Sequence, residues 1–125
     1  MSTESPAERR TRFIAKMLTT GLLWEETADP EAFQVRLDTF VVQVSRTWDQ
    51  MAEEHDYRVS LFNSSGRLLE ELYPGTIDLK LIHELTGHGT TSAFQALYED
   101  ARRKALNVDA SLDAAMKELD DHIPF

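Results

Sequence analysis

The residues with the clearest potential for chemistry are two histidines and a glutamate in the run His83-Glu84-Leu85-Thr86-Gly87-His88. A zinc-protease helix carries two histidines four residues apart, and the glutamate after the first histidine is the general base. Here the histidines are five residues apart, so on a helix their side chains would diverge by about 140°. The run therefore lacks the spacing on which zinc binding by a helix depends.

Two interpretations of this run are open. If Gly87 ends a helix, His88 leaves the helical path, and His83, Glu84 and His88 become candidate ligands of a small metal-dependent hydrolase. In the simpler interpretation, His83 lies on the polar face of a short helix and residues 87–89 form the loop after it. We favour the simpler interpretation, and the sequence then predicts no catalytic residue and no cofactor.

Other sequence motifs of catalysis and ion binding are missing. Cysteine is absent, which excludes disulfides and thiolate chemistry. The five glycines never take the spacing of a phosphate-binding loop, and no calcium loop of the EF-hand type occurs. Adjacent carboxylates such as Glu53-Glu54 do not face each other, as general acid–base catalysis requires. These observations favour a protein that is not an enzyme.

The charge of the chain bears on its partners. Aspartate and glutamate number 22 against 13 lysines and arginines, which gives a formal net charge of −9. A surface that binds nucleic acid needs clustered basic residues, so we expect no nucleic-acid partner. The acidity favours a well-solvated surface. The alternative is an acidic mimic of nucleic acid that inhibits a basic protein.

The length of 125 residues fits one small acidic domain, residues 1–125, with a hydrophobic core of its own. No apolar run is long enough to span a membrane, and the first residues lack the apolar segment of a secretory signal. We therefore expect a cytoplasmic protein that has no membrane partner.

The elements that position these residues are predicted from turn signals and hydrophobic spacing. Ser5-Pro6 begins a first helix, which reaches about residue 22. Asp29-Pro30-Glu31 has the cap, the proline and the acidic first turn of a second helix, predicted to run to Met51. Helical spacing along this second segment is kept by an apolar stripe of Phe33, Leu37, Phe40, Val41, Val44, Trp48 and Met51.

The pattern changes in the middle of the chain. Residues 57–62 alternate with a period of two, and the turn sequence Asn63-Ser64-Ser65-Gly66 follows, which predicts a β-hairpin over about residues 57–73. Residues 67–86 fit either strand or helix. We favour a returning strand up to residue 73, and then a helix that Thr76 caps and Gly87 ends.

Two further helices are predicted near the C-terminus, one starting at Thr90 and one capped by Asp109. The last helix is predicted to turn an apolar stripe of Leu112, Ala115, Met116 and Leu119 inward. The sequence thus predicts an α+β fold. It is a predominantly helical single domain, in which a small antiparallel hairpin, about residues 57–73, lies between an N-terminal helix pair and C-terminal helices.

The sequence favours a non-enzymatic protein–protein interaction or regulatory module, such as a small subunit of a larger bacterial assembly. Its expected contacts with an unidentified protein are Trp24, Val35, Val42 and Phe125, because Val35 and Val42 lie off the stripe of the predicted second helix. That helix would pack on another helix of the same chain or on a second copy, so a homodimer is an open alternative. The metal-dependent hydrolase and the nucleic-acid mimic are the alternative functions.

Overall fold

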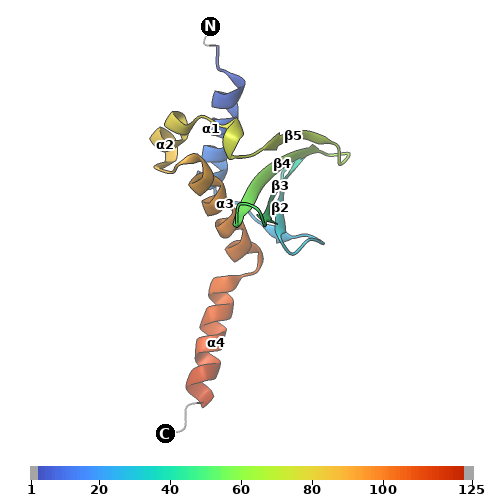
Figure 1. The fold of residues 1–125 in the computed structure, drawn as a ribbon. Coiled ribbons are helices and arrows are strands. Elements are labelled where there is room, and N and C mark those ends of the chain that lie inside the picture. The colour runs from blue at the N-terminus through green and yellow to red at the C-terminus, as the bar shows by residue number, and fades with distance from the viewer. Residues whose placement is uncertain (1–2, 123–125) are drawn as a thin grey trace.

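A five-stranded antiparallel sheet with helices over one face forms the body of the protein (Figure 1). The computed structural model describes residues 3–122. The strands lie in the sheet in the order of the sequence: β1 Glu25–Glu26, β2 Ala32–Arg36, β3 Phe40–Asp49, β4 Glu54–Asn63 and β5 Leu68–Leu72. The helical elements are α1 Pro6–Thr19, the short 3-10 helix η1 Pro74–Thr76, α2 Leu79–Thr86, α3 Thr90–Ala105 and α4 Val108–His122.

The predicted helix from Pro30 to Met51 is wrong, because this segment forms β2, β3 and the turns beside them. The Asp29 carboxylate accepts a hydrogen bond from the Glu31 N–H at 2.8 Å within a turn, and does not cap a helix. Along β3, Val42 and Val44 are both fully buried. The burial thus has a period of two, and the β-branched valines suit a strand.

The fold is α+β, but the prediction of a predominantly helical domain with a small hairpin is wrong. The hairpin over residues 57–73 exists as β4 and β5, which pair antiparallel with Val59 opposite Leu72. It is the last part of a sheet that begins at β1. The N-terminal helix pair is reduced to α1, since strands occupy the place of the second helix.

The remaining helices are confirmed, and several of their ends lie at local signals. However, α1 ends at Thr19 instead of near residue 22, and α4 begins at Val108, so Asp109 lies in its first turn and is not its cap. The Ser5 side chain caps α1 by accepting a hydrogen bond from the Glu8 N–H at 3.1 Å. The cap of α2 is Asp78 instead of the predicted Thr76, and its carboxylate accepts from the Leu81 N–H at 2.8 Å. Gly87 ends α2 with φ of 78°, a conformation that favours glycine.

The core lies between the sheet and the helices. Helix α3 packs across β2, β3 and β4, and α1 packs against α2 and α3. The core side chains come from both layers: Ile14, Met17, Phe33, Val35, Val42, Val44, Val59, Ile82, Phe94, Leu97 and Ala101. On the opposite face of the sheet, Gln34, Gln43, Ser60 and Glu71 lie side by side across four strands. The sheet therefore has one apolar and one largely polar face.

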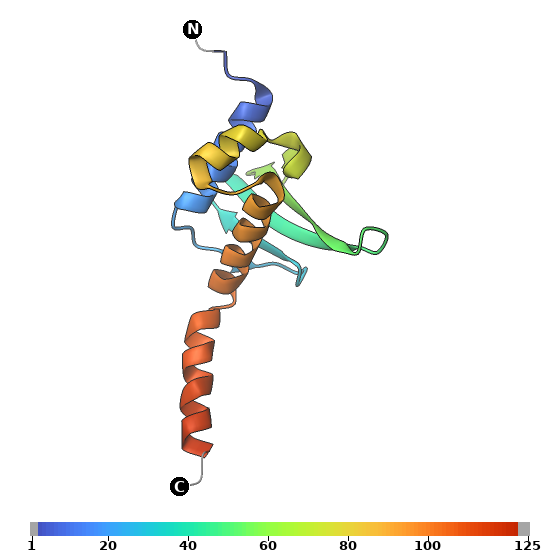
Figure 2. The ribbon, with the colours of Figure 1, turned by 60° about the vertical axis from the view of Figure 1, so that its left-hand side comes forward.

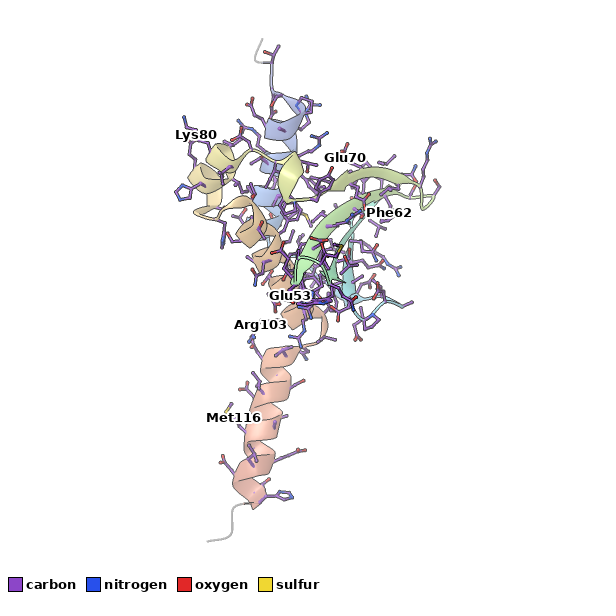
Figure 3. All side chains as sticks on the ribbon, in the orientation of Figure 1. Glu53, Phe62, Glu70, Lys80, Arg103 and Met116 are labelled. Atoms are coloured by element: carbon purple, nitrogen blue, oxygen red, sulfur yellow. The ribbon has the colours of Figure 1, made fainter. Side chains whose placement is uncertain are left out.

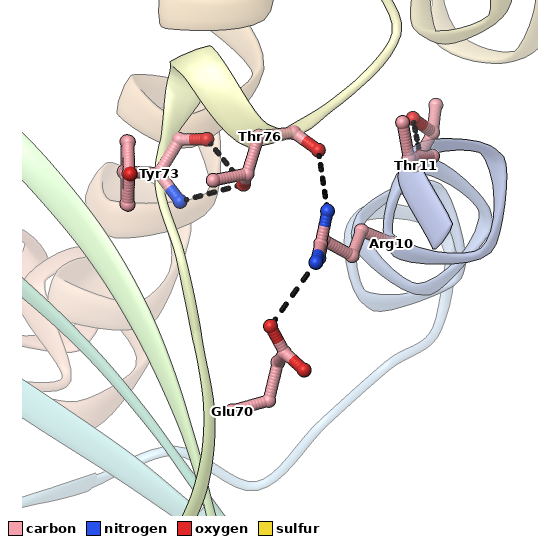
Figure 4. Close-up of polar contacts among 6 residues, drawn as sticks. Arg10, Thr11, Glu70, Tyr73 and Thr76 are labelled. Carbon is pink, nitrogen blue, oxygen red and sulfur yellow. Dashed lines mark hydrogen bonds and ion pairs between the residues drawn. The ribbon is translucent and has the colours of Figure 1, made fainter. Parts of the chain in front are cut away.

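A polar joint ties α1 to the segment that leads into α2 (Figure 4). Arg10 forms an ion pair with Glu70 at 3.3 Å and donates to the carbonyl of Thr76 at 3.4 Å. The hydroxyl of the fully buried Thr11 donates to the Ala7 carbonyl at 2.6 Å and accepts from the Asp78 N–H at 2.8 Å. The ion pair and hydrogen bonds of Arg10 and Thr11 thereby join the helical layer to the edge of the sheet.

Candidate functional site

Helix α4 is the element that the rest of the described chain leaves uncovered. It follows α3 and projects away from the body in both views (Figures 1 and 2). None of its fifteen residues is buried. Its large apolar side chains are exposed by half or more: Leu112 by 52%, Met116 by 54% and Leu119 by 65%.

These side chains share one face of α4. Leu112, Ala115, Met116 and Leu119 follow the spacing i, i+3, i+4 and i+7, which places them in one stripe. An isolated helix of about 12–15 residues is marginal in water, and most helical stability comes from packing of an apolar face. The stripe therefore has the form of a contact surface, while Lys117 lies on the opposite side of the helix.

The two ends of α4 differ in charge. The helix carries five carboxylates and one lysine, a formal charge of −4, and Glu118, Asp120 and Asp121 stand near its C-terminal end. Its N-terminal end adjoins the last turn of α3, which carries Arg102, Arg103 and Lys104. We call these three residues, together with Leu106, the base of α4.

The base holds one cation against α4 itself. The guanidinium of Arg103 pairs with the carboxylate of Asp109 in the first turn of α4. Figure 3 shows the side chains of Arg103 and Met116 on the same, left-hand side of the column that α3 and α4 form. Lys104 of the base likewise pairs with Asp100 at 3.1 Å, so ion pairs stand at the level where α4 begins and Arg102 is the base cation that forms none among the described residues.

A pocket opens beside the base. It is lined by Gly21, Leu22, Leu23, Trp24, Asp100, Arg103, Lys104, Asn107 and Asp109. Leu23 is 90% exposed, whereas Trp24 is buried and its indole N–H has no hydrogen-bond partner among the described residues. Apolar side chains and two ion pairs, Arg103–Asp109 and Lys104–Asp100, thus meet where α4 leaves the body.

A cluster of Glu31, Arg46 and Tyr98 fixes α3, and with it the base, to the sheet. The buried Tyr98 hydroxyl donates to Glu31 Oε2 at 3.1 Å, and the Arg46 guanidinium pairs with the same carboxylate and lies 4.8 Å from the centre of the Tyr98 ring. Burial and the hydrogen bond to Glu31 raise the pKa of Tyr98 to about 12. The hydrogen bond from Arg46 lowers the pKa of Glu31. No sequence motif signals this cluster.

The structure places the predicted partner contacts inside the body. Val35 and Val42 are paired across β2 and β3 and lie in the core, with 3% and 0% exposed. Trp24 is 6% exposed. Phe125 lies outside the described residues. A surface for a partner must therefore be built from other side chains. The sequence predicted that the apolar stripe of α4 faces inward, whereas the structure leaves this stripe exposed.

The predicted metal candidates lie at one end of α2. His83 and Glu84 are exposed on this helix and line an open pocket with Asp78, Leu79 and Lys80. His88 follows in the loop after Gly87. Among residues 3–122, no group of three or more histidine, aspartate or glutamate side chains is arranged to hold a metal ion. Within the same range, no helix has the length and apolar character needed to cross a membrane.

No protein-family model, no curated protein and no solved structure matches this chain. The function is therefore argued from the geometry and charge of its own residues.

Proposed function

We propose that this protein is a non-enzymatic interaction module that binds a protein partner through α4. The observation that carries the proposal is the apolar stripe of Leu112, Met116 and Leu119 on a helix with no buried residue. Burying a leucine or methionine side chain completely is worth about 1.5–3 kcal/mol relative to full exposure. These three side chains are roughly half exposed, so a partner would gain roughly half of that for each.

The body of the protein supports this role by holding the helix in place. The Glu31–Arg46–Tyr98 cluster joins α3 to the sheet, and the Arg103–Asp109 pair joins α3 to the start of α4. The Arg103–Asp109 pair is exposed and contributes at most about 1 kcal/mol, so the anchoring of α3 is the main support for α4. A contact helix that continues from an anchored helix loses less freedom on binding than a helix on a long flexible tether. The sheet and the three other helices thus act as a platform for α4.

The test is site-specific photo-crosslinking in the cells from which the protein comes. A photoreactive amino acid at Met116 lies in the stripe, and the same amino acid at Lys117 lies on the opposite, polar side. We expect a cross-linked protein adduct at Met116 and much less at Lys117. Equal or absent cross-linking at the two positions would contradict the proposal.

A variant gives the matched control for this test. In Leu112→Ala, Met116→Ala, Leu119→Ala the stripe loses its large side chains, while alanine preserves the helical propensity of α4. Because Met116 is replaced in this variant, the photoreactive amino acid is placed at the neighbouring Ala115 in both the variant and the otherwise wild-type protein. We expect the variant to keep the fold of the body and to lose the cross-linked protein adduct.

A further inference from the structure

We infer that the partner of α4 is a second copy of this chain, and that the two α4 helices pair in antiparallel orientation. This inference rests on the proposed function of α4 as a contact helix. It adds the identity of the partner and the direction of the contact, both of which follow from the distribution of charge between the end of α4 and its base.

The spacing of the stripe suits a helix pair. Val108, Leu112, Ala115 and Leu119 are separated by four, three and four residues, the spacing of a two-stranded helical seam. In an antiparallel pair with two-fold symmetry, Val108 lies opposite the partner's Leu119, and Leu112 lies opposite the partner's Ala115. The same patch then serves both chains, as a two-fold interface requires.

The charges select the antiparallel direction. In this register, the partner's Glu118 is level with Asp109, whose carboxylate pairs with Arg103. Lys104 pairs with Asp100, so among the described residues Arg102 is the cation of the base that forms no ion pair. The acidic end of each helix thus lies level with a base that has one cation in excess, and this arrangement occurs twice. A parallel pair would instead bring the two acidic ends together, which costs free energy through like-charge repulsion. Antiparallel helices also align their dipoles favourably.

The base offers uncovered apolar surface at the place where the partner helix would end. Leu106, between α3 and α4, is 36% exposed, and Leu23 in the adjoining pocket is 90% exposed. A helix that lies along α4 and reaches its base would cover Leu106. The apolar stripe and the charge pattern thus point to the same arrangement.

Cysteine cross-linking tests the direction, because the natural chain contains no cysteine. The variants Val108→Cys and Leu119→Cys are purified separately. Each is oxidised alone in a glutathione buffer, and in a separate sample the two are mixed first and then oxidised in the same buffer. In the antiparallel pair, neither variant forms a disulfide-linked dimer alone, and the mixture does. As a control, Lys117→Cys mixed with Val108→Cys gives little cross-linked dimer, because residue 117 faces away from the seam.

The outcomes separate this inference from the proposed function. Sedimentation velocity is expected to show a dimer that the alanine variant of the stripe converts to a monomer. Cross-linking of each cysteine variant with itself would show a parallel pair and overturn the inference. A monomer whose Met116 adduct contains a different protein would overturn the second copy as partner but leave the interaction module in place. A monomer without any adduct would overturn both.

Discussion

At the scale of the residue, Tyr98 joins the helical layer to the sheet through one hydroxyl. The side chain is 1% exposed, and its hydroxyl donates to Glu31. A hydrogen bond to a charged group contributes about 1.5–3 kcal/mol to stability, and a buried group that loses its only partner costs about 1–3 kcal/mol. Glu31 stays paired with Arg46 when Tyr98 loses its hydroxyl, so the carboxylate is not left unpaired.

This hydroxyl predicts how stability changes at alkaline pH. The pKa of Tyr98 is about 12 in the folded protein and about 10 for an unperturbed tyrosine. Between these values the unfolded chain has lost the proton that the folded chain keeps, so the free energy of unfolding falls as pH rises. The stabilising contribution of the protonated Tyr98 hydroxyl is complete below pH 10. By pH 12 the free energy of unfolding has fallen by on the order of 2 kcal/mol from this group.

Urea denaturation at pH 9, 10 and 11 measures this change in wild type and in Tyr98→Phe. The variant starts from a lower free energy of unfolding and declines less steeply. Tyr73→Phe is the matched control, because it removes a hydroxyl from a half-exposed ring and is expected to keep the wild-type decline. Parallel curves for wild type and Tyr98→Phe would refute the role of this hydroxyl.

At the scale of the element, the segment from Pro30 to Met51 shows where sequence patterns mislead. Its apolar residues satisfy a helical stripe, yet four members of that stripe are at least 40% exposed: Leu37, Phe40, Trp48 and Met51. In the sequence, the period-two spacing of Val42 and Val44 is a weaker signal than the helical stripe. In the folded protein, the side chains are buried with this period of two. A short apolar run fits both periods, and only the pairing with β4 decides between them.

Other elements were predictable because their signals are local. The Ser5-Pro6 start of α1, the Asn63-Ser64-Ser65-Gly66 turn and the Gly87 end of α2 all depend on residues adjacent in sequence. The Asn63 side chain accepts from the Ser65 N–H at 3.1 Å, and Gly66 takes a φ of 85°. Such contacts are independent of the rest of the fold, so the sequence alone reveals them.

The strand assignment predicts a difference between two neighbouring valines. Val42→Ala removes two buried methyl groups on the face covered by the helices, whereas Val41→Ala removes them from the opposite, partly exposed face of the same strand. Each substitution changes strand propensity equally. We expect Val42→Ala to lower the free energy of unfolding by about 2 kcal/mol and Val41→Ala by less than about 1 kcal/mol. Urea midpoints measure both, and equal losses would contradict the two-faced sheet.

At the scale of the whole molecule, a helix-covered sheet carries one projecting helix. The sequence predicted the apolar stripe of α4 correctly as a stripe, but not which surface covers it. A stripe that packs on its own domain and one that packs on another chain have the same spacing. Only the placement of α4 beyond the body shows that the described chain itself does not cover Leu112, Met116 and Leu119.

An antiparallel pair predicts that charge-reversed variants recognise each other better than themselves. Arg102→Glu with Lys104→Glu makes the base acidic and keeps the Arg103–Asp109 pair, and Glu118→Lys with Asp120→Lys makes the end of α4 basic. Each variant alone then meets like charges at both ends of its homodimer and dissociates more readily than wild type. In the mixed dimer, the acidic base of one chain meets the basic α4 end of the other. At the opposite end of the pair, the unchanged base and the unchanged acidic α4 end meet as in the wild type.

Native mass spectrometry at low ionic strength compares the three species. We expect the mixed dimer to exceed either homodimer several-fold, with the preference declining as salt screens the charges. The acidic end and the base of one α4 are separated by nearly the full length of this fifteen-residue helix, about 20 Å. Charges at these two places therefore cannot pair within a single chain, and a preference for the mixed dimer must come from contacts between chains. A statistical mixture of dimers would show that these charges do not direct the pairing. Equal weakening of the mixed dimer and both homodimers would place the partner's acidic end away from the base.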